Sequence, residues 1–214
     1  MKQTAIILLF VFITAIALAW LCYYKPLKSM SSLHLFKRED TYPVPSKTFL
    51  KLQAKAAKAK SFARDKNFNT NFCFLIDMSL PSYQNRFFIY DLIKDSTKNS
   101  GLVTHGRCNE DWLEGRKYSN TPGCGCTSIG RYKIGSYYQG RFGLAFKLYG
   151  LDKSNDNAFK RFVVLHSHSC VPETEVNSDV CQSDGCPMVS PGFLKALEAE
   201  IKKSAKPVLL WIYN

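Results

Sequence analysis

The chain has 214 residues, 46% of them hydrophobic and 14% aromatic, a composition that excludes a disordered chain and predicts one folded domain with additional segments. Lys and Arg total 29 against 17 Asp and Glu, and the formal net charge of +12 favours anionic partners such as nucleic acid, anionic lipid or an acidic wall polymer. The sequence contains no known nucleic-acid-binding module, so we expect no nucleic-acid partner, and a solvated basic surface without a specific partner is the alternative.

Residues 1–24 are predicted to be a signal peptide or a membrane anchor. Lys2 precedes an uncharged apolar run from Thr4 to Leu21, a pattern typical of secretory signals and also about long enough to span a bilayer. Ala17-Leu18-Ala19 resembles a cleavage site, whereas the bulky Trp20 and Tyr23 favour an uncleaved anchor at the membrane interface. The sequence therefore predicts export to the periplasm or cell envelope, with N-terminal membrane association at the inner membrane; a buried core helix is the alternative.

Residues 25–69 are predicted to form a tether followed by a basic helix. Ser46 is a suitable N-cap for the segment SKTFLKLQAKAAKAKSFARD, whose Ala, Lys and Leu residues favour a helix. Its apolar residues recur at helical spacing and define a narrow stripe opposite a basic face: Phe49, Leu52, Ala56 and Ala59.

Residues 70–214 are predicted to form one mostly-β domain. Aromatic and branched residues predict strands at 71–80 and 86–93, with a third at 101–106, and the glycine-containing segment 107–140 is expected to be rich in loops. Further strands are predicted at 142–150, 161–167 and 207–213. A helix is predicted after Ser190, which is a suitable N-cap, with Pro191 at the first helical position. Several strands and few helices together predict a mostly-β architecture.

The cysteines have several possible states, because disulfides persist in the oxidising compartments that export implies. The sequence contains eight cysteines, and their pairing does not follow from the sequence alone. Cys170 and Cys181 flank a short polar loop, and a disulfide between them would stiffen this loop and leave Cys186 free.

The stretch from Val163 to Pro191 also holds residues suited to nucleophilic catalysis. Cys186 lies just before the predicted C-terminal helix, and a helix N-terminus favours a thiolate. His166 ends an apolar strand, and an imidazole beside a thiol accepts its proton and later returns it to a leaving group. Backbone N–H groups of Asp184, Gly185 and Cys186 are candidates for an oxyanion hole.

A zinc site is the competing interpretation of the same stretch. The histidines and cysteines there are suitable ligands, but their spacing matches no common zinc motif. We also expect His166 and His168 to diverge, and we therefore predict no metal site.

The sequence LHSHS…SDGCPMVSP resembles the L,D-transpeptidase (YkuD-like) catalytic domain, which has a His on a strand and then a Ser/Thr-x-Gly-Cys loop. The corresponding positions here are His166, Ser167, Ser183, Gly185 and Cys186. Segments 103–106, 118–135, 137–152 and 155–166 are similar, in order, to motifs of the murein L,D-transpeptidase branch. The resemblance covers about residues 70–214 and implies a β-sandwich or open-barrel catalytic domain. Asp184 departs from the better-known members, which have a second His there, and its side chain is expected to point away from the thiol.

The resemblance implies a reaction on peptidoglycan tetrapeptide stems without a cofactor. Cys186 attacks the carbonyl of the third residue, a diamino acid, and His166 moves the proton, with His168 as the second candidate for the base. Ser167 orients the imidazole through its backbone carbonyl, and backbone N–H groups at Gly185 and Asp184 hold the oxyanion. The thioester then passes to an amine of a second stem, which gives a 3-3 cross-link, or to water, which gives an L,D-carboxypeptidase. Carbapenems are expected to acylate the same thiol.

Four residues are predicted to bind substrate: Tyr138, Arg141, Arg161 and Ser183. An arginine can bind a stem carboxylate through two hydrogen bonds, although a structural role is the alternative for each arginine. A non-catalytic wall-binding domain, stabilised by disulfides and without a free thiol, is the alternative for the whole chain. No oligomeric state is predicted.

Overall fold

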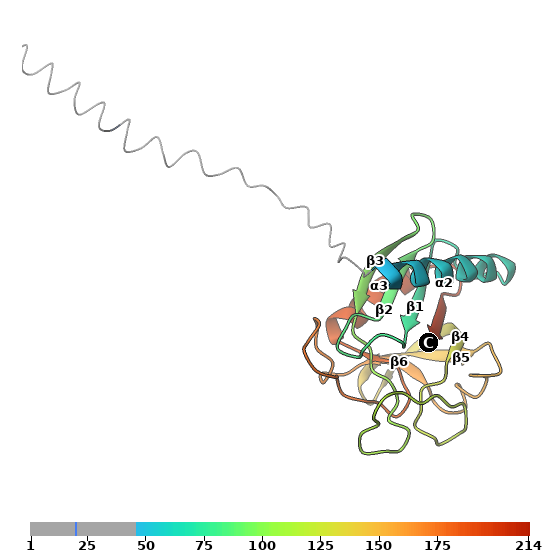
Figure 1. Ribbon diagram of the computed structural model, residues 1–214. Helices are drawn as coiled ribbons and strands as arrows, with labels where there is room; N and C mark the ends of the chain where they lie inside the picture. The colour runs from blue at the N-terminus through green and yellow to red at the C-terminus, as the bar shows by residue number, and fades with distance from the viewer. Residues whose placement is uncertain (1–19, 21–45) are drawn as a thin grey trace, which may run out of the picture. The chain divides into compact units, whose positions relative to one another are not determined.

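Eight strands within residues 46–214 pair into one curved, mixed sheet in the order β3-β2-β1-β8-β4-β5-β6-β7 (Figure 1). The computed structural model describes Trp20 and residues 46–214, in which two helices accompany the sheet, and the predicted mostly-β class is confirmed. The bounds are α2 Ser46–Asp65, β1 Phe72–Asp77, β2 Phe87–Asp91, β3 Ser96–Gly101, β4 Gly130–Gly140, β5 Gly143–Gly150, β6 Val164–Ser167, β7 Met188–Val189, α3 Pro191–Lys202 and β8 Leu209–Tyr213.

The N-terminal predictions fall mostly outside this region. Apart from Trp20, the signal or anchor at 1–24 and the tether at 25–45 lie outside the described residues. Among Trp20 and residues 46–214, no helix combines the length and the hydropathy of a bilayer span.

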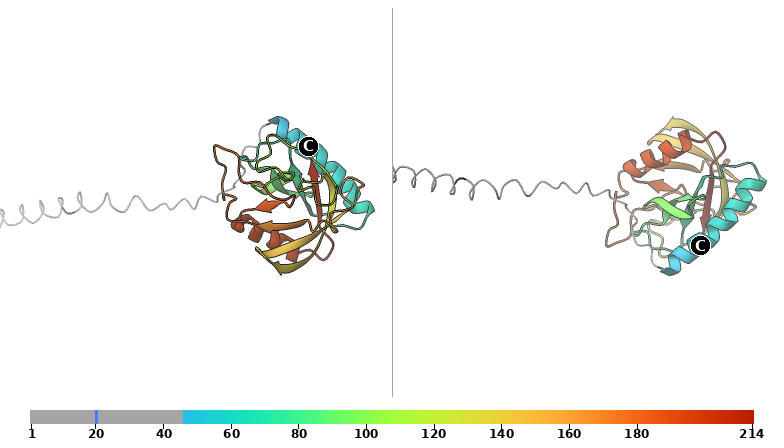
Figure 2. Two further views of the ribbon diagram at one scale, coloured as in Figure 1. Left: turned by 90° about the horizontal axis from the view of Figure 1, so that it is seen from below. Right: turned by 90° about the horizontal axis from the view of Figure 1, so that it is seen from above.

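The two helices cover opposite faces of the sheet (Figure 2). Residues in β1 alternate between these faces: Phe74 and Ile76 are buried in a cluster with α3, whereas Cys73 and Leu75 are buried in a cluster with α2. Both faces of β1 are therefore buried, which explains why this strand reads as a continuous apolar run.

Helix α2 begins and ends where the sequence predicts and packs on the sheet through small residues. Leu52, Ala56 and Ala59 of the predicted stripe are buried, and so is Ala63. The basic face also contacts the sheet, because Lys55 Nζ lies 4.6 Å from the centre of the Trp211 ring. The boundary predicted at residue 70 thus falls between this helix and the sheet that it covers.

Helix α3 has the predicted N-terminus. The Ser190 side chain accepts a hydrogen bond from the Phe193 N–H at 3.2 Å, and Pro191 occupies the first turn.

The two edges of the sheet, β3 and β7, are connected through the residues that follow β3. Residues 101–106 were predicted to form a strand, but β3 ends at Gly101, and the residues after it contact β7 through an isolated bridge between Val103 and Val189. The polar sequence of β3 carries no apolar periodicity because this strand lies at a sheet edge, where most of its residues are exposed or half-buried. This closure matches the open-barrel architecture and brings residues 103–107 against the loop that holds Cys186.

Strand β4 occupies part of the segment that was predicted to be rich in loops. Its register with β5 shifts between Ile134 and Tyr137, and a Cβ added at Gly135 would lie 2.3 Å from the Tyr149 ring. The glycine therefore marks a close approach across the sheet rather than a loop.

Candidate active site

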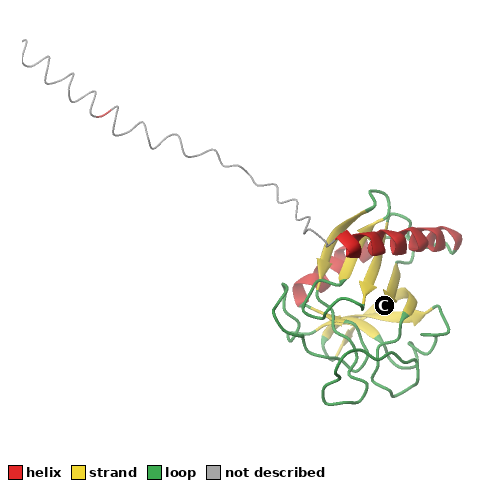
Figure 3. Cartoon of the chain, viewed as in Figure 1, coloured by secondary structure: helices red, strands yellow, loops and turns green. Residues whose placement is uncertain are grey.

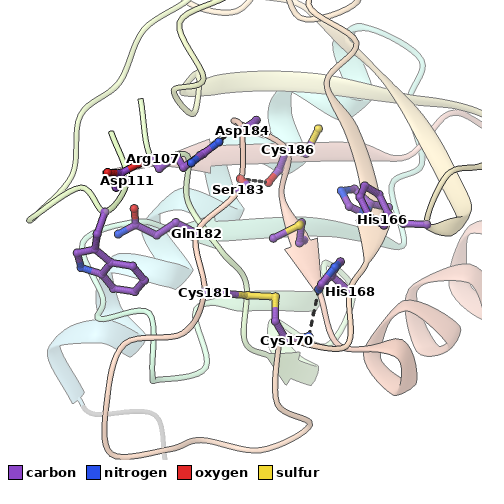
Figure 4. A pocket seen from close by; sticks show the side chains of 13 residues that line it. Arg107, Asp111, His166, His168, Cys170, Cys181, Gln182, Ser183, Asp184 and Cys186 are labelled. Carbon is purple, nitrogen blue, oxygen red and sulfur yellow. Dashed lines mark hydrogen bonds and ion pairs between the residues drawn. A yellow bond between two sulfur atoms is a disulfide. The ribbon is translucent and has the colours of Figure 1, made fainter. Parts of the chain in front are cut away.

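A pocket of about 410 Å³ is lined by residues from several loops and strand ends, and Figure 4 shows its lining. Figure 3 shows how much of the chain beside the sheet is loop. His166, His168 and Cys186 contribute to this lining, as do Cys170 and Cys181. Segments separated by many residues in the sequence therefore meet at one cavity.

The register of β6 and β7 places Cys186 beside the strand that carries His166. The two strands are parallel, with His166 opposite Met188, so Cys186 lies two residues before this pair, alongside Val164. The Cys186 sulfur accepts a hydrogen bond from the Val164 N–H at 3.4 Å. The imidazole is thus carried by β6, and the thiol is carried by the loop two residues before the neighbouring strand β7.

His166 is buried and has a fixed orientation. Only 5% of the residue is exposed, and its Nδ1 lies 3.1 Å from the Ser167 carbonyl oxygen. A carbonyl only accepts, so Nδ1 carries the proton and Nε2 has the free lone pair of a base. Burial lowers the pKa of His166 below its ordinary value, and the nearby His168 acts in the same direction.

The Cys186 thiol lies in surroundings that favour its neutral form. Sγ–H donates to the Phe162 carbonyl oxygen at 3.7 Å. Burial raises the pKa of Cys186, although the Val164 N–H and the charge of Arg161 oppose this shift. The pair is therefore a neutral thiol with a neutral imidazole, which calls for proton transfer during attack rather than a preformed thiolate.

The loop before Cys186 depends on a close backbone contact at Gly185. Its φ is +103°, and an added Cβ would lie 2.6 Å from the carbonyl oxygen of Cys126. Ser183 Oγ closes the turn, because it accepts from the Gly185 N–H at 3.1 Å and donates to the Cys186 carbonyl at 2.7 Å. Ser183 thus holds the loop together instead of presenting a free hydroxyl to a ligand.

The same hydrogen bond changes the prediction for the oxyanion hole. The Gly185 N–H is already bonded to Ser183 and is not free in this conformation. Among the described residues, no acceptor pairs with the N–H of Asp184 or Cys186, so these two groups are the free donors in the loop.

Asp184 lies on the rim of the pocket. Its side chain is 74% exposed and forms an ion pair with Arg107, whose Nε lies 2.8 Å from Oδ1. This pairing directs the carboxylate toward Arg107, yet its charge still raises the pKa of Cys186 slightly. Figure 4 shows the pair beside the loop.

Arg161 does not reach the pocket, contrary to its predicted role in binding a stem carboxylate. Its guanidinium donates to the carbonyls of Ser119 and Cys126, to Ser128 Oγ and to the sulfur of Cys124. These bonds occupy the guanidinium with acceptors from the 119–128 segment. Arg161 therefore fixes the backbone that Gly185 packs against.

Tyr138 and Arg141 also lie outside the lining of the pocket. Both belong to the β4–β5 hairpin, and the lining residue there is instead Phe142, whose ring stacks on His166 at 5.3 Å between centroids. The sequence placed Phe142 in the predicted strand 142–150 and gave no site role to Phe142, Trp112 or Arg107, because no local pattern links these residues to the stretch that holds His166 and Cys186.

The expected divergence of His166 and His168 was wrong. Residues i and i+2 of an extended chain face the same side, and both rings contact Phe142, the second at 5.3 Å with an edge-on geometry. His168 Nδ1 accepts from the Cys170 N–H at 3.1 Å. Within residues 46–214 and Trp20, no three His, Cys, Asp or Glu residues are grouped to hold a metal ion.

Two disulfides flank the candidate site. Cys170 pairs with Cys181 at the pocket, and Cys108 pairs with Cys126 behind Gly185. Within the described region, Cys73, Cys124 and Cys186 are free, so the interpretation without a free thiol does not describe this structure.

Comparison with solved structures finds similar chains at low sequence identity. An L,D-transpeptidase from Xylanimonas cellulosilytica is 16% identical, with a TM-score of 0.37, and the match covers 76% of this chain and 77% of that one. The helical cell shape determining protein Pgp2 (K307A mutant) from Campylobacter jejuni is 12% identical, with a TM-score of 0.45 and coverages of 76% and 56%. The L,D-transpeptidase LdtMt1 in complex with imipenem is 13% identical, with a TM-score of 0.37 and coverages of 67% and 59%.

The comparison with curated proteins gave no match. The family model described as the L,D-transpeptidase catalytic domain matches residues 44–213, which is most of the chain and includes α2. The protein therefore belongs to the L,D-transpeptidase catalytic-domain family, whose members modify the peptidoglycan of the cell wall.

Proposed function

We propose that the protein is a cysteine-dependent L,D-transpeptidase that acts on tetrapeptide stems through a thioester at Cys186. The observation that supports this most directly is the shared pocket of Cys186 and His166, with His166 Nδ1 bonded to the Ser167 carbonyl. This bond leaves Nε2 as the acceptor for the thiol proton.

The proposed acylation step transfers one proton and exchanges one bond. His166 Nε2 takes the proton of Cys186 while the sulfur attacks the carbonyl carbon of the third stem residue. The N–H groups of Asp184 and Cys186 stabilise the oxyanion. The bond to the terminal D-alanine nitrogen breaks, that nitrogen receives the proton from His166, and a thioester remains.

The second step decides the product. A side-chain amine of another stem attacks the thioester, gives its proton to His166 and forms a new amide, while Cys186 recovers its proton. If water attacks instead, the product is a free tripeptide and the enzyme is an L,D-carboxypeptidase. Phe142 stacks on the base and is one of the residues that line the pocket, an arrangement that supports exclusion of water during transfer.

Incubation with imipenem followed by intact mass measurement tests the nucleophile. We expect one adduct on the wild-type protein and none on Cys186→Ala. Cys124→Ala is the matched control, because Cys124 is another free and partly accessible thiol, and its adduct should persist. Absence of an adduct on the folded wild type, together with no conversion of a purified tetrapeptide stem, would refute the proposal.

Mass spectrometry of the stem products then separates the two reactions. A cross-linked dimer with released D-alanine identifies the transpeptidase, whereas tripeptide without dimer identifies the carboxypeptidase.

The family acts on the cell wall, which implies an extracytoplasmic location for the catalytic domain. We propose that residues 1–24 direct export and attach the chain to the inner membrane. A fusion of these residues to a reporter that is active only outside the cytoplasm tests export, and membrane fractionation tests attachment.

A further inference from the structure

Phe162 adopts a backbone conformation that side chains with a Cβ rarely take. Its φ is +56°, at the end of a run of turns over residues 153–162. The Val163 N–H donates to the Ala158 carbonyl at 3.0 Å, and the Phe162 N–H donates to the Phe159 carbonyl at 3.1 Å. These two bonds are the Schellman pattern, in which glycine usually occupies the position of Phe162.

The ring of Phe162 contributes little to the stability of the folded chain. The residue is 84% exposed, and it belongs to none of the hydrophobic clusters found among the described residues. Glycine would fit this backbone better and would expose less apolar surface. Folding stability therefore does not explain a phenylalanine here, and a strained residue of this kind points toward function.

Phe162 is also in direct contact with the nucleophile. Its carbonyl oxygen accepts the Sγ–H of Cys186, and the Val164 N–H two residues later donates to the same sulfur. Phe162 does not line the pocket, so its exposed ring lies outside the cavity that His166 lines, on the residue whose carbonyl contacts the thiol. An acyl group on Cys186 that leaves the pocket on this side would pass the ring.

The chemistry of the acyl group indicates which part meets the ring. Under the proposed function, the residue joined to Cys186 is a diamino acid, whose side chain is a run of methylene groups with a polar end. Methylene groups gain free energy when they leave water against an apolar surface. The ring of Phe162 is an apolar surface of this kind and has no polar atom.

We propose that Phe162 contacts the substrate: its ring packs against the methylene arm of the acylated diamino acid and so favours stems with a long aliphatic side chain at that position. This inference rests on the proposed function and adds a determinant of specificity to it.

Phe162→Gly tests the inference, because it removes the ring while relieving the backbone. We expect the thermal midpoint to stay equal or to rise. The rate of Cys186 alkylation by iodoacetamide should stay within twofold of wild type. For a tetrapeptide with a diamino acid at its third position, kcat/KM should fall about tenfold. For a tetrapeptide with alanine there, kcat/KM should not change.

Asn67→Gly is the matched control. Asn67 has φ +58° at the corresponding end of α2, where the Phe68 N–H bonds to the Ala63 carbonyl, whereas the contact with the Cys186 thiol is made by Phe162. Asn67→Gly should leave kcat/KM unchanged for both tetrapeptides.

Each remaining outcome overturns the inference. An unchanged kcat/KM in Phe162→Gly would show that the ring does not meet the substrate. An equal decrease in kcat/KM for both tetrapeptides, or slower alkylation of Cys186, would show that Phe162 positions the thiol and does not contact the side chain of the third stem residue. A wild-type protein that converts neither tetrapeptide would refute the proposed function, and this inference with it.

Discussion

Replacement of Gly185 by alanine should disrupt the nucleophile loop more than the size of a methyl group suggests. A residue with a Cβ in a left-handed backbone costs about 1–2 kcal/mol. The added Cβ would also lie 2.6 Å from the Cys126 carbonyl oxygen, which is itself held by Arg161 Nη2 at 2.6 Å. Forcing such an overpacked contact costs about 1–3 kcal/mol more. We therefore expect Gly185→Ala to lower the free energy of unfolding by about 2–5 kcal/mol.

Thermal unfolding and acylation measure the two consequences of this change. For a domain of this size, the expected loss corresponds to a decrease in the melting temperature of about 4–20 °C. Displacement of Cys186 by about 1 Å should slow acylation by imipenem about a hundredfold.

Gly123→Ala is the control for the backbone term alone. Gly123 has φ +76° and open space around the position of a Cβ, so this variant should lose only about 1–2 kcal/mol. If Gly185→Ala has the same melting temperature as Gly123→Ala and is acylated by imipenem at the wild-type rate, the close contact with Cys126 does not constrain the loop.

Two further predictions concern the electrostatics of the site. Because burial lowers the pKa of His166, the imidazole stays neutral to more acidic pH. The acidic limb of the kcat/KM profile should therefore lie below pH 6.5. A limb above that value would contradict the assignment of His166 as a buried base. The charge of Arg161 lowers the pKa of Cys186, so Arg161→Met should raise the pH at which the thiol becomes reactive to iodoacetamide, whereas Arg161→Lys, which retains a charge, should shift it less. Both variants leave buried acceptors unpaired and should lose about 1–3 kcal/mol of stability, as measured by chemical denaturation; equal thiol profiles in the two variants would refute the electrostatic role.

The order and type of most elements followed from the sequence because their signals are local. Apolar runs predicted β1, β2, β5, β6 and β8 within a few residues, and the cap at Ser190 predicted the start of α3. The strands that were missed or misplaced lack such a signal: β3 is polar and lies at an edge, β4 is interrupted by glycines that permit close packing, and β7 has only two residues.

The sequence by itself determined the mostly-β class, the family, and the candidate nucleophile and base, because these depend on residue types and spacings within one short stretch. The tertiary structure alone decided which residues surround that pair. Arg161 was a candidate ligand for substrate, yet its guanidinium donates to acceptors in segment 119–128. Phe142, which the sequence placed in a strand without a role in the site, stacks on His166. These contacts join residues separated by more than 20 positions, and such residues meet only once strand order and register are set, which no local pattern encodes.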